Sequence, residues 1–184
     1  MHSSSHFEYM LLLLCRKTWS SLTFIGGLMR PNTISSALII APVSILRSWE
    51  KEAGKVIPPS CLPNLKIHVL TSKMPRRDRQ RILRTALKGD KRNQYLVITS
   101  YGLIANDPQD FVCDTQGFDY VVLDEAHKIK NDSTQVTQGC RRVCNCANTR
   151  RLLLTGTPIQ NNLKEMWVLF DFATSGKLLG PYRR

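Results

Sequence analysis

The chain has 184 residues, of which 42% are hydrophobic and 8% aromatic, and its formal net charge is +12. This length suits one domain with a sizeable core, and the apolar content excludes a largely disordered chain. The strong positive charge favours a polyanionic partner, with nucleic acid as the first candidate.

Apolar, β-rich runs alternate with helical patterns along the chain. The runs are short and nearly continuous, which is typical of strands buried on both faces of a parallel sheet. We expect strands at residues 37–42, 65–71, 95–100, 120–125 and 151–156. Apolar residues at helical spacing follow the first, second, fourth and fifth of these, and their faces carry Trp49, Leu83, Cys140 and Trp167. This order predicts an α/β fold with a doubly wound, mainly parallel sheet and helices on both faces.

Two segments lack such patterns. We expect residues 1–10 to be disordered and residues 105–119 to form a polar surface loop. The apolar run at residues 9–15 is far shorter than the roughly 20 residues that cross a bilayer. No Lys or Arg precedes it, as a secretory signal would require, so the sequence predicts neither membrane insertion nor secretion.

The chain holds six cysteines and four histidines, but their spacing gives no zinc pattern. Cys140 and Cys144 share helical spacing with apolar residues. We therefore interpret the cysteines as reduced thiols, mostly buried, and favour this over a metal site.

Small polar or charged residues end or directly follow four of the expected strands. They are Ser44, Thr99 with Ser100, Asp124 with Glu125, and Thr155 to Thr157. The carboxyl ends of parallel strands meet at one edge, where ligands bind, so this convergence predicts a site. In phosphoryl transfer one carboxylate holds Mg²⁺ and a second can orient the attacking water. Taken alone, Asp124 and Glu125 could equally be a solvated strand end or a helix start, where acids are favoured.

Four segments together resemble the motifs of the SNF2 family of ATP-dependent DNA translocases, within superfamily 2 of the helicases. In chain order they read LIIAPVSILRSWEKE, ITSYGLI, VVLDEAHKIKN and LLLTGTPIQNNLKEMWVLFDF. Within the family the resemblance is closest to the branch of excision-repair, Cockayne-syndrome-B and mitotic checkpoint translocases. It implies a RecA-like fold of the P-loop NTPase type.

The resemblance also implies a domain organisation. Residues 20–180 would be the N-terminal, ATP-binding lobe, and residues 1–19 an irregular N-terminus with a degenerate phosphate loop. Residues 181–184 would be a truncated tail. We expect the second RecA-like lobe of the family, with its arginine finger, to be missing.

Carried over position by position, the resemblance implies roles at the nucleotide. Asp124 would bind Mg²⁺, Glu125 would position and activate the water, and His127 would couple the nucleotide site to the TGTPIQNN segment. The residues of that segment that would relay the state of the nucleotide or complete the match are Thr155, Gly156, Thr157, Gln160 and Asn161. The residues that would face DNA phosphates without reading bases are Pro42, Ser44, Thr99 and Ser100.

The phosphate loop of the family, GxGKT, is matched only in part. Lys17 and Thr18 stand where its lysine and threonine should be, but Arg16 occupies the glycine position before the lysine. The backbone N–H groups of such a loop cradle phosphates, in conformations that penalise a residue other than glycine. Lys17 and Thr18 are therefore candidate ATP ligands, and the alternative is a Lys-Thr pair that occurs by chance.

Nine basic residues and two aspartates lie between Lys73 and Arg92. One interpretation is an electrostatic footprint for DNA phosphates, made by Arg76, Arg77, Arg79 and Arg81. The other is the solvated face of an amphipathic helix, since only Arg84 falls among the apolar positions. No aromatic residue interrupts the segment, which argues against stacking on single-stranded bases.

The sequence as a whole predicts one lobe of a nuclear SNF2-type DNA-dependent ATPase that uses ATP and Mg²⁺ in chromatin remodelling or DNA repair. Expected partners are double-stranded DNA without sequence preference, nucleosomes or repair proteins, and a second RecA-like lobe. We expect the chain alone to be inactive. One alternative is a non-catalytic lobe that grips DNA or a partner, which the degenerate phosphate loop favours. Another is a superfamily 2 RNA helicase, which TGTPIQNN followed by LFDF disfavours.

Overall fold

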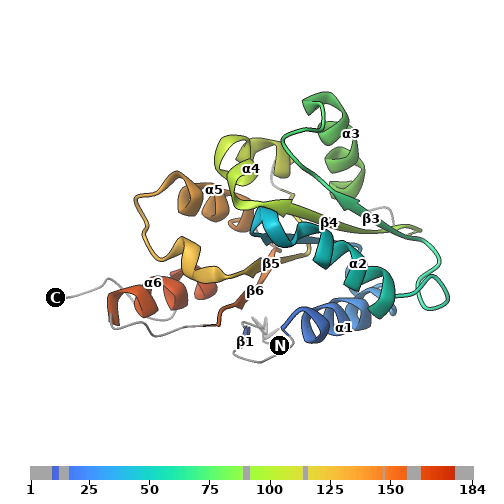
Figure 1. The fold of residues 1–184 in the computed structure, drawn as a ribbon, viewed down its shortest axis with the longest axis horizontal. Helices are drawn as coiled ribbons and strands as arrows, with labels where there is room; N and C mark the ends of the chain where they lie inside the picture. The colour runs from blue at the N-terminus through green and yellow to red at the C-terminus, as the bar shows by residue number, and fades with distance from the viewer. Residues whose placement is uncertain are drawn as a thin grey trace, which may run out of the picture.

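Strands and helices alternate along the chain in the computed structural model, which describes residues 10–12, 17–88, 92–113, 116–146, 148–156 and 163–176 (Figure 1). The strands are β1 Met10–Leu12, β2 Ser36–Ala41, β3 Leu65–Val69, β4 Gln94–Ser100, β5 Tyr120–Asp124 and β6 Arg150–Leu154. The α-helices are α1 Lys17–Met29, α2 Leu46–Val56, α3 Arg76–Leu87, α4 Tyr101–Asn106, α5 Gln135–Cys144 and α6 Leu163–Thr174. Short 3₁₀ helices are η1 Val43–Ile45, η2 Pro108–Phe111 and η3 Ala126–Ile129.

The strands form one sheet in the order β1-β6-β5-β2-β4-β3, and every pairing in it is parallel. The central strands β2, β4 and β5 are buried along their whole length, as their continuous apolar runs predict. All five expected strands are present, and the predicted doubly wound parallel fold is confirmed.

The register brings the carboxyl ends of the strands to one level. Leu154 pairs with both Leu12 of β1 and Asp124 of β5, and Ala41 pairs with Ser100 across β2 and β4. Because these strands stop together, the segments that follow them share one edge of the sheet. This is the edge where ligands bind in open α/β folds.

Helices cover both faces of the sheet, each with its own apolar core. Helices α1 and α2 lie on one face, where Leu22 and Trp49 are buried against the sheet. Helices α3 to α6 lie on the other, with Leu83, Cys140 and Phe172 in the core (Figure 1).

The structure corrects two expectations about irregular segments. Residues 10–12 form β1 and residues 17–19 begin α1, so a boundary after residue 19 would divide a helix. The segment 105–119 is not only a surface loop, because Phe111 and Phe118 are 1% and 0% exposed and complete the core under α3 to α6. The many polar residues of the segment led us to expect a surface loop, although two of its aromatic residues are buried.

Cys140 and Cys144 are free thiols buried in this core, as expected from their spacing. Burial raises the pKa of Cys144 to about 12, which leaves it a neutral thiol. The described residues contain no group of three or more His, Cys, Asp or Glu that could hold a metal by itself. None of the described helices combines the length and apolar character needed to cross a membrane.

Candidate functional site

Asp124 ends β5 at the carboxyl edge of the sheet, and its side chain is held from two directions. Its Oδ2 accepts a hydrogen bond of 2.9 Å from the Trp49 indole, and its Oδ1 accepts one of 2.9 Å from the Glu125 amide. Burial raises the pKa of the Asp124 carboxyl, the hydrogen bond from Trp49 opposes the rise, and the Glu125 charge adds to it. The result is a buried carboxylate of fixed orientation.

Glu125 adopts a left-handed backbone conformation, with φ 54° and ψ 52°. A residue other than glycine pays about 1–3 kcal/mol for such a conformation, and such strain clusters at functional sites. The turn separates the two carboxylates, so the Glu125 side chain is 35% exposed while Asp124 is buried. Adjacent residues thus supply one enclosed and one accessible carboxylate.

His127 lies in the 3₁₀ turn after Glu125. Its Nδ1 is 3.2 Å from Oε2 of Glu125, a close approach without the alignment of a hydrogen bond. The histidine expected to couple the two motifs therefore contacts the accessible carboxylate.

Lys17 is brought into this group by the first turn of α1. Its Nζ is 3.9 Å from Oε1 of Glu125, and its side chain is only 17% exposed. A Cβ added to Gly156 would lie 3.1 Å from the same Nζ, so a side chain there would crowd the ammonium group. Glycine at this position leaves room for the lysine.

The other residues expected at the nucleotide are less informative. Thr155 directly follows β6 and is 0% exposed, and Thr18 is half-buried in the first turn of α1. Thr157, Gln160 and Asn161 lie outside the described residues, as do Arg16 and the rest of the segment between β1 and α1.

The arrangement fits a metal-bound phosphate better than a bare metal ion. Lys17 offers an ammonium group for a phosphate, and Asp124 and Glu125 offer oxygens for Mg²⁺. Mg²⁺ is usually held by one or two carboxylates, with phosphates and water completing its octahedron.

The residues expected to face DNA differ in what they present to solvent. Ser44 is exposed and Pro42 half-buried at the turn after β2. The Thr99 hydroxyl is buried and donates to the Leu70 carbonyl at 3.2 Å, and Ser100 Oγ caps α4 by accepting from the Leu103 amide. In this structure the hydroxyls of Thr99 and Ser100 are thus hydrogen-bonded within the protein, whereas Ser44 is exposed to solvent.

Two of the arginines expected to contact DNA form ion pairs with aspartates of this chain. Arg79 is 6% exposed and pairs with Asp107 at 3.0 Å, and Arg76 pairs with Asp110 at 3.0 Å. Hydrogen bonding to Asp110 raises the pKa of Arg76. The expectation that Arg84 joins the apolar face is wrong, because Arg84 is exposed and Arg79 takes the inward position opposite Asp107.

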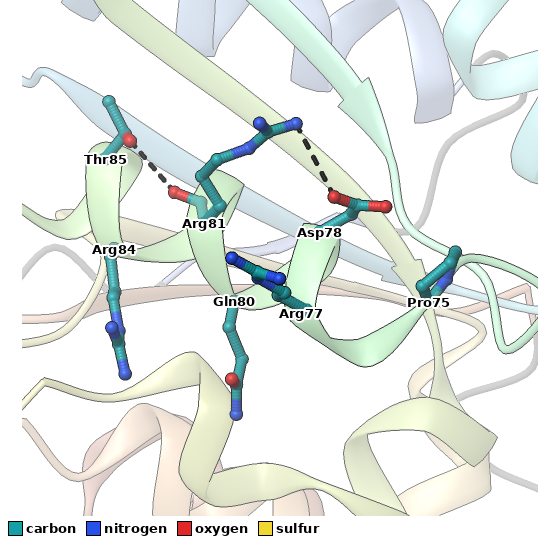
Figure 2. A pocket seen from close by; sticks show the side chains of 7 residues that line it. All are labelled: Pro75, Arg77, Asp78, Gln80, Arg81, Arg84 and Thr85. Atoms are coloured by element: carbon teal, nitrogen blue, oxygen red, sulfur yellow. Dashed lines mark hydrogen bonds and ion pairs between the residues drawn. The ribbon is translucent and has the colours of Figure 1, made fainter.

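A basic stripe remains on the outer face of α3, made of Arg77, Arg81 and Arg84. Their spacing of four and three residues places them on one side of the helix, where they line an open pocket (Figure 2). Arg81 lies 3.6 Å from Asp78 in an exposed ion pair, which contributes little to stability. Of the four arginines predicted to contact DNA, Arg77 and Arg81 belong to this exposed stripe.

Two residues at the site were missed by the sequence analysis. The Trp49 indole reaches Asp124 Oδ2, and the Tyr101 hydroxyl donates to the Asp124 carbonyl at 2.7 Å. The position of Trp49 on an apolar helix face indicated only core packing, and Tyr101 was part of the ITSYGLI motif without a role of its own. A buried indole or phenol usually finds a hydrogen-bond partner, and that chemistry was the available signal.

The family model of the SNF2-related domain matches residues 15–180. Among curated proteins, the chain is 38% identical over 175 residues to the "DNA excision repair protein ERCC-6-like" of Homo sapiens. It is 31% identical over 172 residues to "Protein CHROMATIN REMODELING 24" of Arabidopsis thaliana. These alignments cover 91% and 88% of the chain but only 13% and 15% of the two relatives. The chain thus spans a small part of their length, and the expected excision-repair branch is confirmed.

Solved structures give the same result for the fold. The "Sulfolobus solfataricus SWI2/SNF2 ATPase core in complex with dsDNA" superposes with a TM-score of 0.71 at 25% identity, over 96% of this chain and 33% of that chain. The Pyrococcus furiosus Hef helicase domain reaches a TM-score of 0.64 at 16% identity, which shows the fold alone.

Proposed function

Because the chain belongs to the SNF2-related domain family, we propose that it forms the N-terminal, ATP-binding lobe of an ATPase that moves along double-stranded DNA. The membership leaves no reason to keep the RNA-helicase alternative. The complete protein would act in the nucleus, in DNA repair or chromatin remodelling, with nucleosomes or repair proteins as further partners. The names of the relatives support this assignment.

One observation carries the proposal: Lys17, Glu125 and Gly156 meet beside Asp124, although they come from distant parts of the chain. In the proposed site the Lys17 ammonium binds nucleotide phosphates, with Thr18 next to it. The Asp124 carboxylate holds Mg²⁺, which neutralises the charge that develops on the phosphates.

Glu125 is the group placed to act on the attacking water. Its carboxylate is accessible, as a group that must meet a water molecule requires. In this structure it is engaged by Lys17 and His127, and a phosphate that draws Lys17 away would release it. His127, Thr155 and Gly156 would then relay the state of the nucleotide, as the family resemblance implies.

Duplex DNA is the proposed partner of the same edge and of the basic stripe. The structure of the Sulfolobus solfataricus SWI2/SNF2 ATPase core is a complex with dsDNA, which supports this proposal. In this chain the exposed turn at Pro42 and Ser44 and the arginines at positions 77 and 81 are the proposed contacts. Such contacts neutralise phosphates and hold the backbone without reading bases.

A second candidate function is a non-catalytic lobe that binds DNA or a protein partner. The observation that favours it is Arg16, which replaces a glycine of the phosphate loop. A lobe without a working phosphate loop would keep the DNA contacts and lose ATP turnover.

Isothermal titration with Mg·ATP separates the two functions. The chain itself should bind no more tightly than about 1 mM, which corresponds to about 4 kcal/mol. Restoring the loop with Leu14→Gly and Arg16→Gly should tighten binding, and adding Lys17→Met or Asp124→Asn to that variant should weaken it again. An ATP affinity that is unchanged by the Lys17 and Asp124 substitutions would overturn the proposed site. Micromolar binding by the unmodified chain would show instead that the loop works with Arg16 in place.

A further inference from the structure

The carboxylate of Asp124 is supported by a side chain that the proposed mechanism does not use. Trp49 lies in the first turns of α2 and is 1% exposed, and its Nε1 donates to Oδ2 of Asp124 at 2.9 Å. The Glu125 amide donates a hydrogen bond of 2.9 Å to Oδ1 of Asp124. Each carboxylate oxygen therefore has one fixed donor and keeps acceptor capacity for another ligand.

Support for Asp124 comes from both faces of the sheet. Trp49 belongs to the core beneath α1 and α2, and Tyr101 belongs to the core beneath α3 to α6. Tyr101 is 5% exposed and donates its hydroxyl to the Asp124 carbonyl at 2.7 Å. One aromatic residue fixes the carboxylate, and the other fixes the backbone that carries it.

Close packing makes Trp49 a rigid donor. Its ring lies among buried residues of α1, α2 and the sheet, such as Leu22 and Ile39, so its indole N–H cannot follow a carboxylate that turns away. A charge-assisted hydrogen bond in a water-poor site is also stronger than one at the surface. The Asp124 side chain is thereby limited to orientations that keep Oδ2 on the indole.

We propose that Trp49 is a positioning residue for the metal-binding carboxylate of Asp124, through which helix α2 sets the geometry of the metal site. The inference rests on the proposed function, because it takes Asp124 as the metal ligand. It also connects the exposed turn at Pro42 and Ser44, which leads directly into α2, with the nucleotide site. Partners that support a metal ligand in this way typically change metal affinity by about 10–100-fold when removed.

The test measures binding of Mn²⁺, an oxygen-preferring paramagnetic stand-in for Mg²⁺, to the whole chain. Mn²⁺ broadens NMR signals of nearby nuclei even at low occupancy, so the initial slope of broadening of the Glu125 amide reports relative affinity. Trp49→Phe keeps an aromatic ring in the core and removes only the indole and its donor. We expect it to reduce the slope about 10–100-fold. Asp124→Asn should remove the broadening.

Trp19→Phe is the matched control. Trp19 is 48% exposed on α1, and after Lys55 it contributes to lowering the pKa of Glu52, so it too acts on a carboxylate. This variant should give the slope of the unmodified chain. A Trp49→Phe slope equal to that of the unmodified chain, with broadening still lost in Asp124→Asn, would overturn the positioning role alone. Broadening that persists in Asp124→Asn would overturn the metal assignment, and the positioning role with it.

A second measurement keeps the inference testable if Trp49→Phe does not fold. The chain has three tryptophans, so ¹⁵N-indole labelling gives three side-chain signals. In the unmodified chain Mn²⁺ should broaden the Trp49 indole signal before those of Trp19 and Trp167, and Asp124→Asn should shift Trp49 most. Equal broadening of all three signals, or a Trp49 signal that ignores Asp124→Asn, would overturn the proposal.

Discussion

The left-handed backbone of Glu125 lowers the stability of the fold but places the Glu125 carboxylate at the proposed site. The conformation turns the Glu125 side chain toward Lys17 and His127 while Asp124 stays buried. Glycine would adopt the same φ without a steric penalty. The glutamate is therefore expected to be retained for what its carboxylate does.

Glu125→Gly should raise the free energy of unfolding by about 1 kcal/mol, because it relieves the backbone strain and removes a charge next to Asp124. The variant also removes the ion pair with Lys17, but that pair is long at 3.9 Å and Asp124 remains as a negative charge near the lysine. Chemical denaturation measures the change. The control is Lys128→Gly, a neighbouring exposed position without positive φ, which should destabilise the chain. Equal destabilisation by both variants would contradict the strain at Glu125.

At the scale of elements, helices α4 and α5 approach so closely that only glycine fits between them. A Cβ on Gly139 of α5 would lie 2.6 Å from the carbonyl oxygen of Ile104 in α4. That atom belongs to the backbone, so it cannot move aside as a flexible side chain could.

Gly139→Ala should therefore lower the free energy of unfolding by about 1–3 kcal/mol, the usual cost of overpacking. The matched control is Gly54→Ala in α2, where an added Cβ meets nothing within 4 Å. Because alanine favours helix, that variant should gain up to about 1 kcal/mol. Thermal or urea unfolding of the two variants gives the comparison, and the same sign for both would refute the close approach.

The arginines of helix α3 fall into two groups, one paired with aspartates of the chain and one exposed to solvent. Arg76 and Arg79 tie the helix to Asp107 and Asp110 next to η2, and the basic stripe faces solvent. Substitutions on the two sides should therefore have different consequences for the molecule.

Arg77→Glu with Arg81→Glu should reduce the slope of log affinity against log salt for duplex DNA by about 0.9 for each phosphate that is no longer neutralised. The fold should stay intact, because neither side chain is buried. A double variant of equal charge, Arg30→Glu with Lys55→Glu at α1 and α2, is the control and should change the slope less. Fluorescence anisotropy at several salt concentrations checks this. Equal slopes for both double variants would show that the arginines of α3 do not contact DNA phosphates.

Arg79→Glu, by contrast, should destabilise the chain, because Arg79 is buried and paired with Asp107.

At the scale of the whole molecule, the proposed motor needs parts from outside this sheet. Phosphoryl transfer requires a phosphate cradle, metal and water carboxylates, and a cation for the charge of the transition state. The described residues supply the carboxylates and Lys17. An arginine finger is worth about 10³–10⁵ in rate, and in the SNF2 resemblance it belongs to the second lobe.

The chain alone should accordingly show negligible ATP turnover in a phosphate-release assay, even with Leu14→Gly and Arg16→Gly. Fused to a second RecA-like lobe, the form with both glycines should hydrolyse ATP in a DNA-stimulated manner. Asp124→Asn in that fusion should abolish turnover and spare DNA binding. Turnover that survives Asp124→Asn would contradict the role of this carboxylate.

The sequence predicted the sheet well because buried parallel strands leave continuous apolar runs, and Asp124 could be placed at a strand end from the run that precedes it. It could not show that Lys17 contacts Glu125 and lies beside Gly156, because these residues are distant in sequence and meet only when the sheet forms. For the same reason the sequence could not predict that Arg79 points inward, since its partner Asp107 comes after β4 in the chain. A charged side chain on an apolar helix face is predicted only when its partner is known.

Strand β1 has a single neighbour in the described sheet, β6, to which it is joined over three residues. During synthesis β1 leaves the ribosome early, whereas β6 emerges only after nearly all the rest of the lobe. The apolar strand that precedes Lys17 must therefore wait unpaired while β2, β4 and β5 can already associate. Pairing of β1 with β6 is then expected to be one of the last steps of folding, and until it occurs the apolar strand remains exposed.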